Sequence, residues 1–138
     1  MIVVMKPEAT DAEIEQVEEK IGELVDEHPD RDVFRSLPTG SQVTIAALCT
    51  LFGPDREESY DWRHYSSFYG TSPITKQSGN HKVVKMRKGR DETIHKALLN
   101  FADSTRHKSD CWAHAYYLKK RSEGKAHYHA LRCLASRW

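Results

Sequence analysis

The sequence predicts a mainly α-helical protein: a small helical domain with a helix-hairpin-helix-like element and a short basic β-like arm, preceded by an amphipathic coiled-coil-like helix. Apolar residues recur at spacings of three and four over much of the chain, which is the period of a helix with one buried face. Only residues 81–86 alternate in the way that favours a strand. We therefore expect two parts, residues 1–27 as a short strand plus an acidic helix, and residues 28–138 as the helical domain.

Length and composition allow one ordinary domain with a thin core. The chain has 138 residues, of which 38% are hydrophobic and 30% are charged. The net charge of +1 hides an asymmetry, because residues 1–32 hold 11 acids and 3 bases, net −8, and the rest holds 18 bases and 9 acids, net +9. We therefore consider the acidic N-terminal part and the basic body separately.

The three cysteines, Cys49, Cys111 and Cys133, are odd in number and have no paired spacing. Together with the lack of a signal peptide, they predict a reducing compartment rather than a disulfide framework. No apolar run is long enough to span a bilayer. We expect a cytoplasmic protein with no membrane partner.

The N-terminal part starts with a β-prone run at residues 1–5. Thr10 and Glu13 have the spacing of a capping box, so a helix is predicted to begin there. The apolar residues that follow form a narrow stripe at spacings of three, four and three: Ile14, Val17, Ile21 and Leu24. This stripe favours either a dimerisation or inter-domain helix, or a helix that packs on its own domain.

Residues 34–48 predict a helix, a tight hairpin and a second helix that ends near Gly53. This segment resembles a helix-hairpin-helix, and the resemblance implies that backbone N–H groups at the start of the second helix, here those of Gly40 and Ser41, contact a nucleic-acid phosphate. The alternative is that the apolar residues of this segment simply build the core.

Residues 62–90 contain no Asp or Glu and seven Lys or Arg residues. Such a segment is typical of phosphate binding. Its aromatic residues, Trp62, Tyr65, Phe68 and Tyr69, either stack on bases or bury against a helix.

Within this segment, residues 71–79 read TSPITKQSG. Pro73 fixes one φ and Gly79 frees another, so we expect Ser78 on a turn with an exposed hydroxyl, beside Lys76 and Lys82. That hydroxyl is a candidate phosphate ligand or nucleophile. The candidate nucleic-acid-binding residues of the arm are Lys76, Gln77, Gly79, Lys82, Lys85, Arg87, Lys88 and Arg90.

Three helices are predicted after Gly89. The first is capped by Asp91 and buries Ile94, Ala97, Leu98, Phe101 and Ala102. The second is opened by Asp110, presents Trp112, Ala115, Tyr116 and Leu118, and is stopped by Gly124. The third runs through Leu131, Leu134, Ala135 and Trp138 to the end of the sequence.

Several histidines and a cysteine invite a zinc site: His107, Cys111, His114, His127 and His129. The sequence has no CxxC or HxxxH pair, however, and these residues would converge only if the chain bends at Asp110. We therefore expect solvent-facing histidines and no metal site.

Two further sequence features carry a resemblance. Residues 69–79, YGTSPITKQSG, followed by VVKMR at 83–87, resemble the serine motif in the C-terminal domain of insertion-sequence family one-ten transposases, the RNA-guided group that includes the pilin-gene inversion protein. The match runs from about residue 28 to the end. Residues 1–24 also resemble, more weakly, the first strand and helix of the regulatory domain of heptulosonate-phosphate synthases.

The transposase resemblance implies a function for residues 28–138 as the C-terminal helical, DNA-binding serine domain. It implies that Ser78 is the catalytic serine of strand exchange, that the partners are DNA and a structured guide RNA, and that residues 11–27 contact a second copy or a full-length transposase. It also implies an N-terminal RuvC-like nuclease domain whose acids bind Mg²⁺. That domain is not visible here, so we expect no cofactor in this chain.

Three functions follow in order of preference. The first is a partial transposase or recombinase that binds DNA and guide RNA, contributes Ser78 to strand exchange, and is inactive without the RuvC-like domain. The alternative is a non-catalytic nucleic-acid-binding module derived from such a transposase. The third takes residues 1–24 as part of a metabolic enzyme, but no phosphate-sugar site follows them.

Overall fold

The computed structural model describes residues 7–39, 41–51 and 61–138. Within them the fold is mainly α-helical with one small two-stranded sheet, which confirms the predicted fold class. The elements are, in order, α1 Asp11–Asp26, α2 Arg31–Arg35, α3 Gln42–Leu51, α4 Trp62–Phe68, β1 Ile74–Ser78, β2 His81–Lys85, α5 Glu92–Arg106, α6 Trp112–Ser122 and α7 His127–Ala135. The strand predicted at residues 1–5 and the helix end predicted near Gly53 lie outside the described residues.

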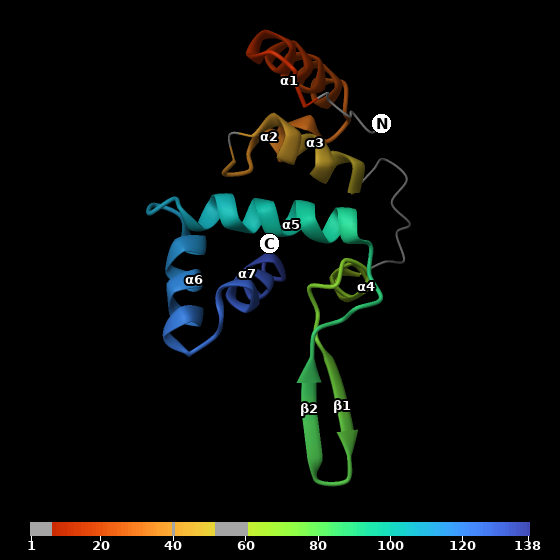
Figure 1. Cartoon of the computed structure of the whole chain (residues 1–138), viewed down its shortest axis with the longest axis vertical. Coiled ribbons are helices and arrows are strands. Elements are labelled where there is room, and N and C mark those ends of the chain that lie inside the picture. The colour runs from red at the N-terminus through yellow and green to blue at the C-terminus, as the bar shows by residue number, and fades with distance from the viewer. Residues whose placement is uncertain (1–6, 40, 52–60) are drawn as a thin grey trace.

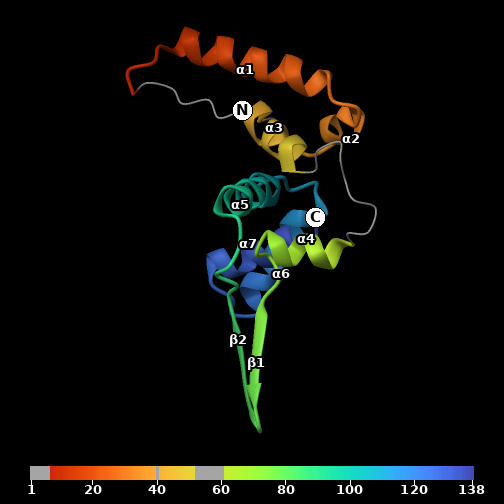
Figure 2. The ribbon, with the colours of Figure 1, turned by 90° about the vertical axis from the view of Figure 1, so that its right-hand side faces the viewer.

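Helix α5 crosses the middle of the molecule (Figure 1). On one side α3 packs against it and α1 packs on α3; on the other side α6 and α7 pack against it and against each other. The β1–β2 hairpin projects from the helices at the end opposite to α1, as both views show (Figure 2). The acidic helix and the basic arm are therefore far apart.

The core surrounds α5, as its apolar spacing predicted. Asp91 caps the helix by accepting a hydrogen bond from the N–H of Ile94 at 3.0 Å. Three apolar residues of α5 are buried: Leu98, Phe101 and Ala102. The neighbouring helix α7 packs against α5 and buries Leu131, Leu134 and Ala135. At the chain end the indole N–H of Trp138 donates to the Thr105 hydroxyl at 3.2 Å.

The buried residues of α6 are not the apolar residues from which the sequence predicted this helix. Ala113 and Tyr117 are buried, whereas Ala115 and Leu118 are exposed. The residue before the helix is Cys111 rather than Asp110. The reason is that α6 packs against both α5 and α7. The small side chain of Ala113 permits these helices to approach closely. The Tyr117 hydroxyl lies 2.8 Å from Nδ1 of His127 on α7.

Helix α1 begins with the predicted capping box, because Thr10 Oγ1 accepts from the N–H of Glu13 and the Glu13 carboxylate accepts from the N–H of Thr10 at 2.8 Å. The helix packs on its own chain. Val25 is buried against the core, and Arg35 bonds the Asp26 carboxylate at 2.8 Å and the Gly22 carbonyl at 3.3 Å.

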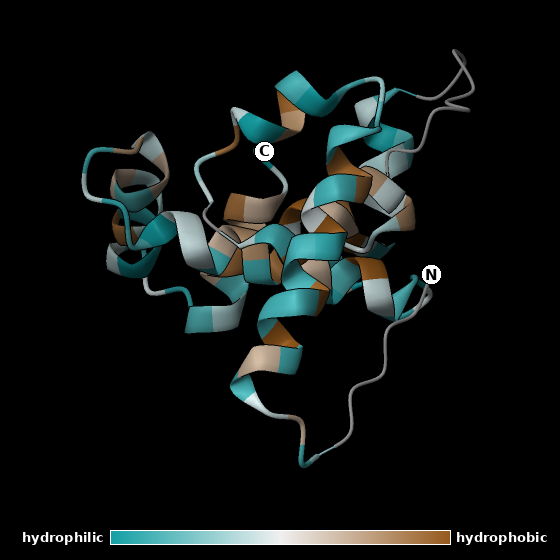
Figure 3. Cartoon of the chain, turned by 90° about the horizontal axis from the view of Figure 1, so that it is seen from above, coloured by the Kyte–Doolittle hydropathy of each residue, from teal (hydrophilic) through white to brown (hydrophobic). Residues whose placement is uncertain are grey.

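The remaining apolar stripe of α1 is only partly covered. Ile14 and Leu24 are exposed. Seen from above, hydrophilic and hydrophobic residues alternate along the helices of the chain (Figure 3). One of the two interpretations of the stripe, packing on the same chain, is thus observed for part of the helix. Contact with a second copy or a full-length transposase stays a prediction.

The hairpin is antiparallel, with pairs running from Ile74 opposite Lys85 to Ser78 opposite His81. Gly79 has φ 55°, and no residue other than glycine has positive φ among the described residues, so the two-residue turn is of the II′ kind. The sequence predicted β2 but placed residues 74–78 in a loop. They form β1 instead, because Pro73 lies before the strand and Gly79 begins the turn after it.

Two contacts fix the root of the hairpin. Gly70 precedes β1 and has φ 71°; a Cβ on it would lie 2.2 Å from Cδ and 2.9 Å from Cβ of Arg90, which follows β2. Next to it, Nδ1 of the buried His95 on α5 donates to the carbonyl of Tyr69 at 2.9 Å. Burial lowers the pKa of His95, so the ring is neutral at pH 7.

Replacing Gly70 by Ala should destabilise the protein by about 2 kcal/mol or more, because the substitution combines a left-handed φ with overlap against an atom next to the Arg90 backbone. The melting temperature measures this. The matched control is Gly89→Ala, where φ is not positive and no atom lies within 4 Å of the added Cβ. Equal melting temperatures for the two variants would show that Gly70 and Arg90 are not in close contact at the root of the hairpin.

Candidate nucleic-acid interface

The two faces of the hairpin carry different side chains. Cross-strand partners share a face and successive residues alternate, so the pairing places Lys76, Ser78, His81, Val83 and Lys85 on one face. Gln77 and Lys82 form a pair on the other face. All of these side chains except that of Val83 are exposed. The arm therefore presents cations on both faces.

Ser78 is exposed, as predicted, but it is the last residue of β1 rather than part of the turn. Its predicted neighbour Lys82 lies on the opposite face, because the register pairs Lys82 with Gln77. The residue opposite Ser78 is His81. The sequence analysis did not identify His81 as a neighbour of Ser78. The signal that could have found it is the two-residue turn, because such a turn makes residues 78 and 81 cross-strand partners.

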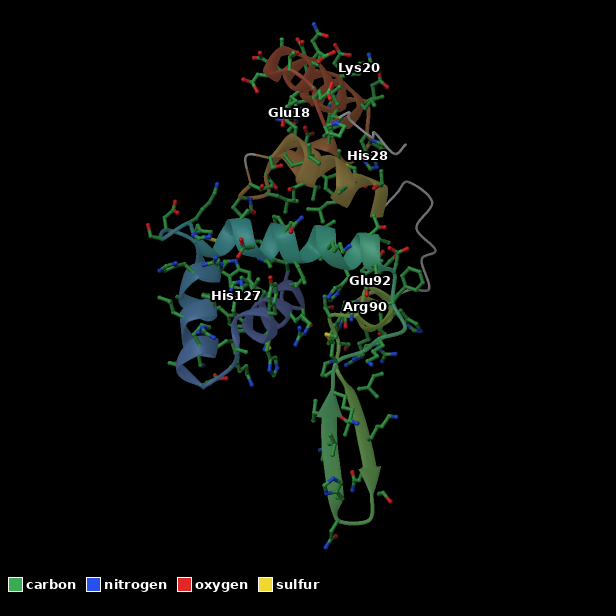
Figure 4. The ribbon with its side chains drawn as sticks, viewed as in Figure 1. Glu18, Lys20, His28, Arg90, Glu92 and His127 are labelled. Atoms are coloured by element: carbon green, nitrogen blue, oxygen red, sulfur yellow. The ribbon has the colours of Figure 1, made fainter. Side chains whose placement is uncertain are left out.

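The cations after β2 differ in exposure. Lys88 is exposed and Arg87 is half-buried. The Nε atom of Arg87 is buried and has no hydrogen-bond partner among the described residues. The Arg90 side chain is only 10% exposed and pairs with Glu92, Nη2 to Oε1 at 2.8 Å (Figure 4). Its Nη1 also donates to the carbonyl of Arg87 at 2.6 Å. Arg90 therefore belongs to the root of the hairpin and not to the exposed surface predicted for it.

The loop between α2 and α3 lies on the other side of α5 from the hairpin (Figures 1 and 2). Ser41 uses its groups within the loop: its N–H donates to Thr39 Oγ1 and its Oγ accepts from the N–H of Thr44, both at 3.3 Å. Gly40 lies outside the described residues. The structure therefore does not bring Ser41 together with the residues of the arm.

Helix α4 supplies the aromatic side chains next to the arm. The Asp61 carboxylate caps α4 by accepting hydrogen bonds from the backbone N–H groups of Arg63 and His64. These hydrogen bonds lower the pKa of the Asp61 carboxyl, and the bond from His64 has the largest effect. Tyr69 is 4% exposed, whereas Trp62 and Phe68 are 65% and 62% exposed. Burial, one of the two predicted roles, is thus observed for Tyr69. Trp62 and Phe68 remain at the surface, and stacking on bases stays a prediction.

Comparison with known proteins gives the family. The family model described as "Transposase IS116/IS110/IS902 family" matches residues 31–118, more than half of the chain. The chain belongs to this transposase family. The matched segment includes the whole hairpin and its root, and it confirms the predicted resemblance to an insertion-sequence transposase family.

A curated relative of this transposase-family chain is the protein of Streptomyces coelicolor (strain ATCC BAA-471 / A3(2) / M145) named "Mini-circle putative transposase for IS117". The two are 30% identical over 112 residues, which are 81% of this chain and 27% of the relative. The chain thus spans about a quarter of the relative's length. The family model begins at residue 31, so the resemblance of residues 1–24 to a synthase stays a prediction.

The histidines of this transposase-family chain make contacts within the fold. His114 Nδ1 donates to the carbonyl of Arg106 at 2.7 Å, and His127 bonds Tyr117. In the described ranges no three His, Cys, Asp or Glu side chains lie close enough together to hold a metal ion. The same ranges contain no helix that is both long and apolar enough to cross a membrane.

Two neighbouring cations should respond differently to replacement. Arg90→Ala removes an ion pair, a backbone hydrogen bond and the packing on Gly70, and should cost about 1–3 kcal/mol of stability. Lys88→Ala, the control, should change stability by no more than about 0.5 kcal/mol, since the side chain is exposed. Thermal unfolding of both variants decides this, and a stable Arg90→Ala would show that Arg90 does not hold the root.

Proposed function

We propose that this chain is the nucleic-acid-binding, serine-bearing part of an insertion-sequence transposase, whose hairpin arm presents Ser78 to a DNA phosphate. One observation carries the proposal. In a chain of a transposase family, the arm stands away from the helical body and holds Ser78 on one exposed face with Lys76 and Lys85.

The charge and shape of the arm support binding to nucleic acid. Lys76, Lys82, Lys85 and Lys88 are exposed, and no acid lies in residues 62–90. A two-stranded ribbon fits the major groove of DNA, where cations on its two faces reach the phosphates of both strands. The resemblance adds a structured guide RNA as the second partner, and cytoplasmic action in a bacterium or archaeon.

The chemistry proposed for Ser78 is attack of Oγ on a phosphodiester phosphorus. An Oγ–P bond forms, the bond from phosphorus to one sugar oxygen breaks, and that oxygen leaves with a proton. His81, opposite Ser78 in the pairing, is an imidazole of the kind that accepts a serine proton. Lys76 and Lys85 stabilise the additional negative charge on the phosphoryl oxygens.

Metal chemistry would belong to another part of the protein. The resemblance places Mg²⁺ on the acids of a RuvC-like domain, and the described residues of this chain offer no comparable group of ligands. The chain matches 27% of its curated relative. We therefore propose that strand exchange requires a RuvC-like domain in addition to the residues described here, and that residues 11–27 contact a second copy or a full-length transposase.

A second candidate function is a non-catalytic nucleic-acid-binding module that keeps the basic arm and performs no chemistry. The exposed lysines of the arm support binding under this function as they do under the first. The two functions agree on binding and differ on Ser78 alone.

Affinity for duplex DNA should fall steeply with salt. Four exposed cations and one half-buried one give a slope of log affinity against log salt of about −4. Replacing Lys76, Lys82 and Lys85 by Ala together should reduce the magnitude of this slope by about 3, because each phosphate contact contributes about 0.9. Fluorescence anisotropy over a salt series measures both values.

The control for this prediction removes the same charge elsewhere. Lys96, Lys108 and Lys119 are exposed on α5, on the loop after it and on α6. Their joint replacement by Ala should leave most of the slope in place. If both triple variants lose the slope equally, the binding is due to net charge and not to the arm.

Ser78→Ala separates the two candidate functions. The side chain is exposed, so stability should change by no more than about 0.5 kcal/mol and DNA affinity should stay nearly constant. When a RuvC-like domain, guide RNA and Mg²⁺ are supplied, strand exchange should be abolished, because no neighbouring group replaces a covalent nucleophile. Retained exchange with Ser78→Ala would leave only the binding function.

A further inference from the structure

A pocket lies beside the root of the hairpin, between α4 and the segment that joins β2 to α5. Its volume is about 760 Å³, within the range of pockets that hold small organic groups. The described residues that line it include three aromatic side chains of α4 and its end, Tyr65, Phe68 and Tyr69, and two residues of the connecting segment, Arg87 and Gly89. None of the functions assigned to the arm uses this pocket.

The aromatic rings give the pocket flat apolar walls. Tyr65 and Tyr69 are stacked, with ring centroids 5.7 Å apart and an angle of 26° between their planes. Phe68 meets Tyr69 edge to face, with centroids 5.5 Å apart, and remains 62% exposed. Burial raises the pKa of the Tyr69 hydroxyl, so this ring stays neutral. An exposed Phe beside two stacked Tyr rings is a surface on which another planar ring can stack.

The polar groups at the pocket favour an anion next to that ring. Arg63 and Arg87 both line it, and the Nε of Arg87 is buried without a hydrogen-bond partner in the described part of the chain. One acid, Asp61, also lines it. Its Oδ1 accepts from the backbone N–H groups of Arg63 and His64 and lies 3.0 Å from His64 Nδ1. Its Oδ2 lies 3.6 Å from Nη1 of Arg63, so Asp61 balances the charge of Arg63 and leaves Arg87 as the cation for an anion.

We propose that this pocket takes a single unstacked base of the nucleic acid that the arm binds, with the base on Phe68 and Tyr65 and its phosphate on Arg87. The inference rests on the proposed function and extends it from backbone contact to recognition of an unpaired nucleotide. A base within a duplex is stacked on both sides and cannot enter such a pocket. DNA with a flipped-out base and RNA with a bulge supply the same planar ring and phosphate.

The location of the pocket agrees with this ligand. Arg87 and Gly89 lie a few residues after the end of β2, so a strand whose phosphates lie along Lys76 and Lys85, which share one face of the hairpin, continues toward the pocket. An apolar peptide segment would use the rings equally well but would gain nothing from Arg63 and Arg87. The combination of stacked rings and guanidinium groups therefore favours a nucleotide.

The test compares two otherwise identical duplexes, one with a single bulged nucleotide and one with an abasic residue in its place, each prepared as DNA and as RNA. The intact chain should bind the bulged duplex about 5- to 100-fold more tightly, the gain expected from one base stacked on an aromatic ring. Phe68→Ala should remove this difference and leave affinity for the abasic duplex unchanged. Tyr128→Ala, an exposed ring on α7, is the matched control and should retain the difference.

The comparison on the unmodified chain needs no variant, so it stays decisive even if Phe68→Ala fails to fold. Equal affinity for bulged and abasic duplexes, in both DNA and RNA, would overturn the pocket; the proposed function would stand if binding remained steeply salt-dependent. If no duplex binds at all, the proposed function itself is wrong. A bulge preference in DNA or in RNA supports the proposal and shows which nucleic acid supplies the base.

Discussion

The hairpin arm depends on the close contact between Gly70 and Arg90. These residues stand before β1 and after β2, so their contact closes the base of the hairpin. A two-stranded hairpin by itself is only marginally stable in water. The adjacent bond from His95 to the Tyr69 carbonyl ties the same point to α5 and hence to the core. The orientation of the arm relative to the helices therefore follows from packing at its root.

This arrangement divides one cluster of cations into two roles. In the sequence, the seven basic residues of 62–90 form a single group. In the fold, the lysines of the hairpin are exposed, Arg87 is half-buried beside the aromatic pocket, and Arg90 is enclosed with Glu92 as its partner. Arginine suits an enclosed position because its planar guanidinium satisfies several acceptors, whereas lysine keeps a strongly hydrated charge at the surface.

The two charged parts of the chain lie at opposite ends of the molecule. Arg35 anchors the acidic α1 on α2 and α3, and the hairpin projects from the other side of α5. Carboxylates close to the arm would weaken the binding of phosphate that we propose for it, and this separation keeps them away from the lysines of the hairpin. It also leaves Ile14 and Leu24 of α1 exposed where a partner could reach them without blocking the arm.

The sequence by itself determined what depends on near neighbours in the chain: the helical period, the caps at Thr10 and Asp91, the buried face of α5, the turn at Gly79 and the membership of a transposase family. Tertiary structure decided what depends on distant partners. The buried face of α6 was set by the corner between α5 and α7, and the enclosure of Arg90 by a glycine twenty positions earlier. The pairing of Ser78 with His81 rather than Lys82 was set by hairpin register. Local periodicity and capping are encoded within one turn of helix, whereas register and burial are properties of surfaces that meet only after the chain has folded.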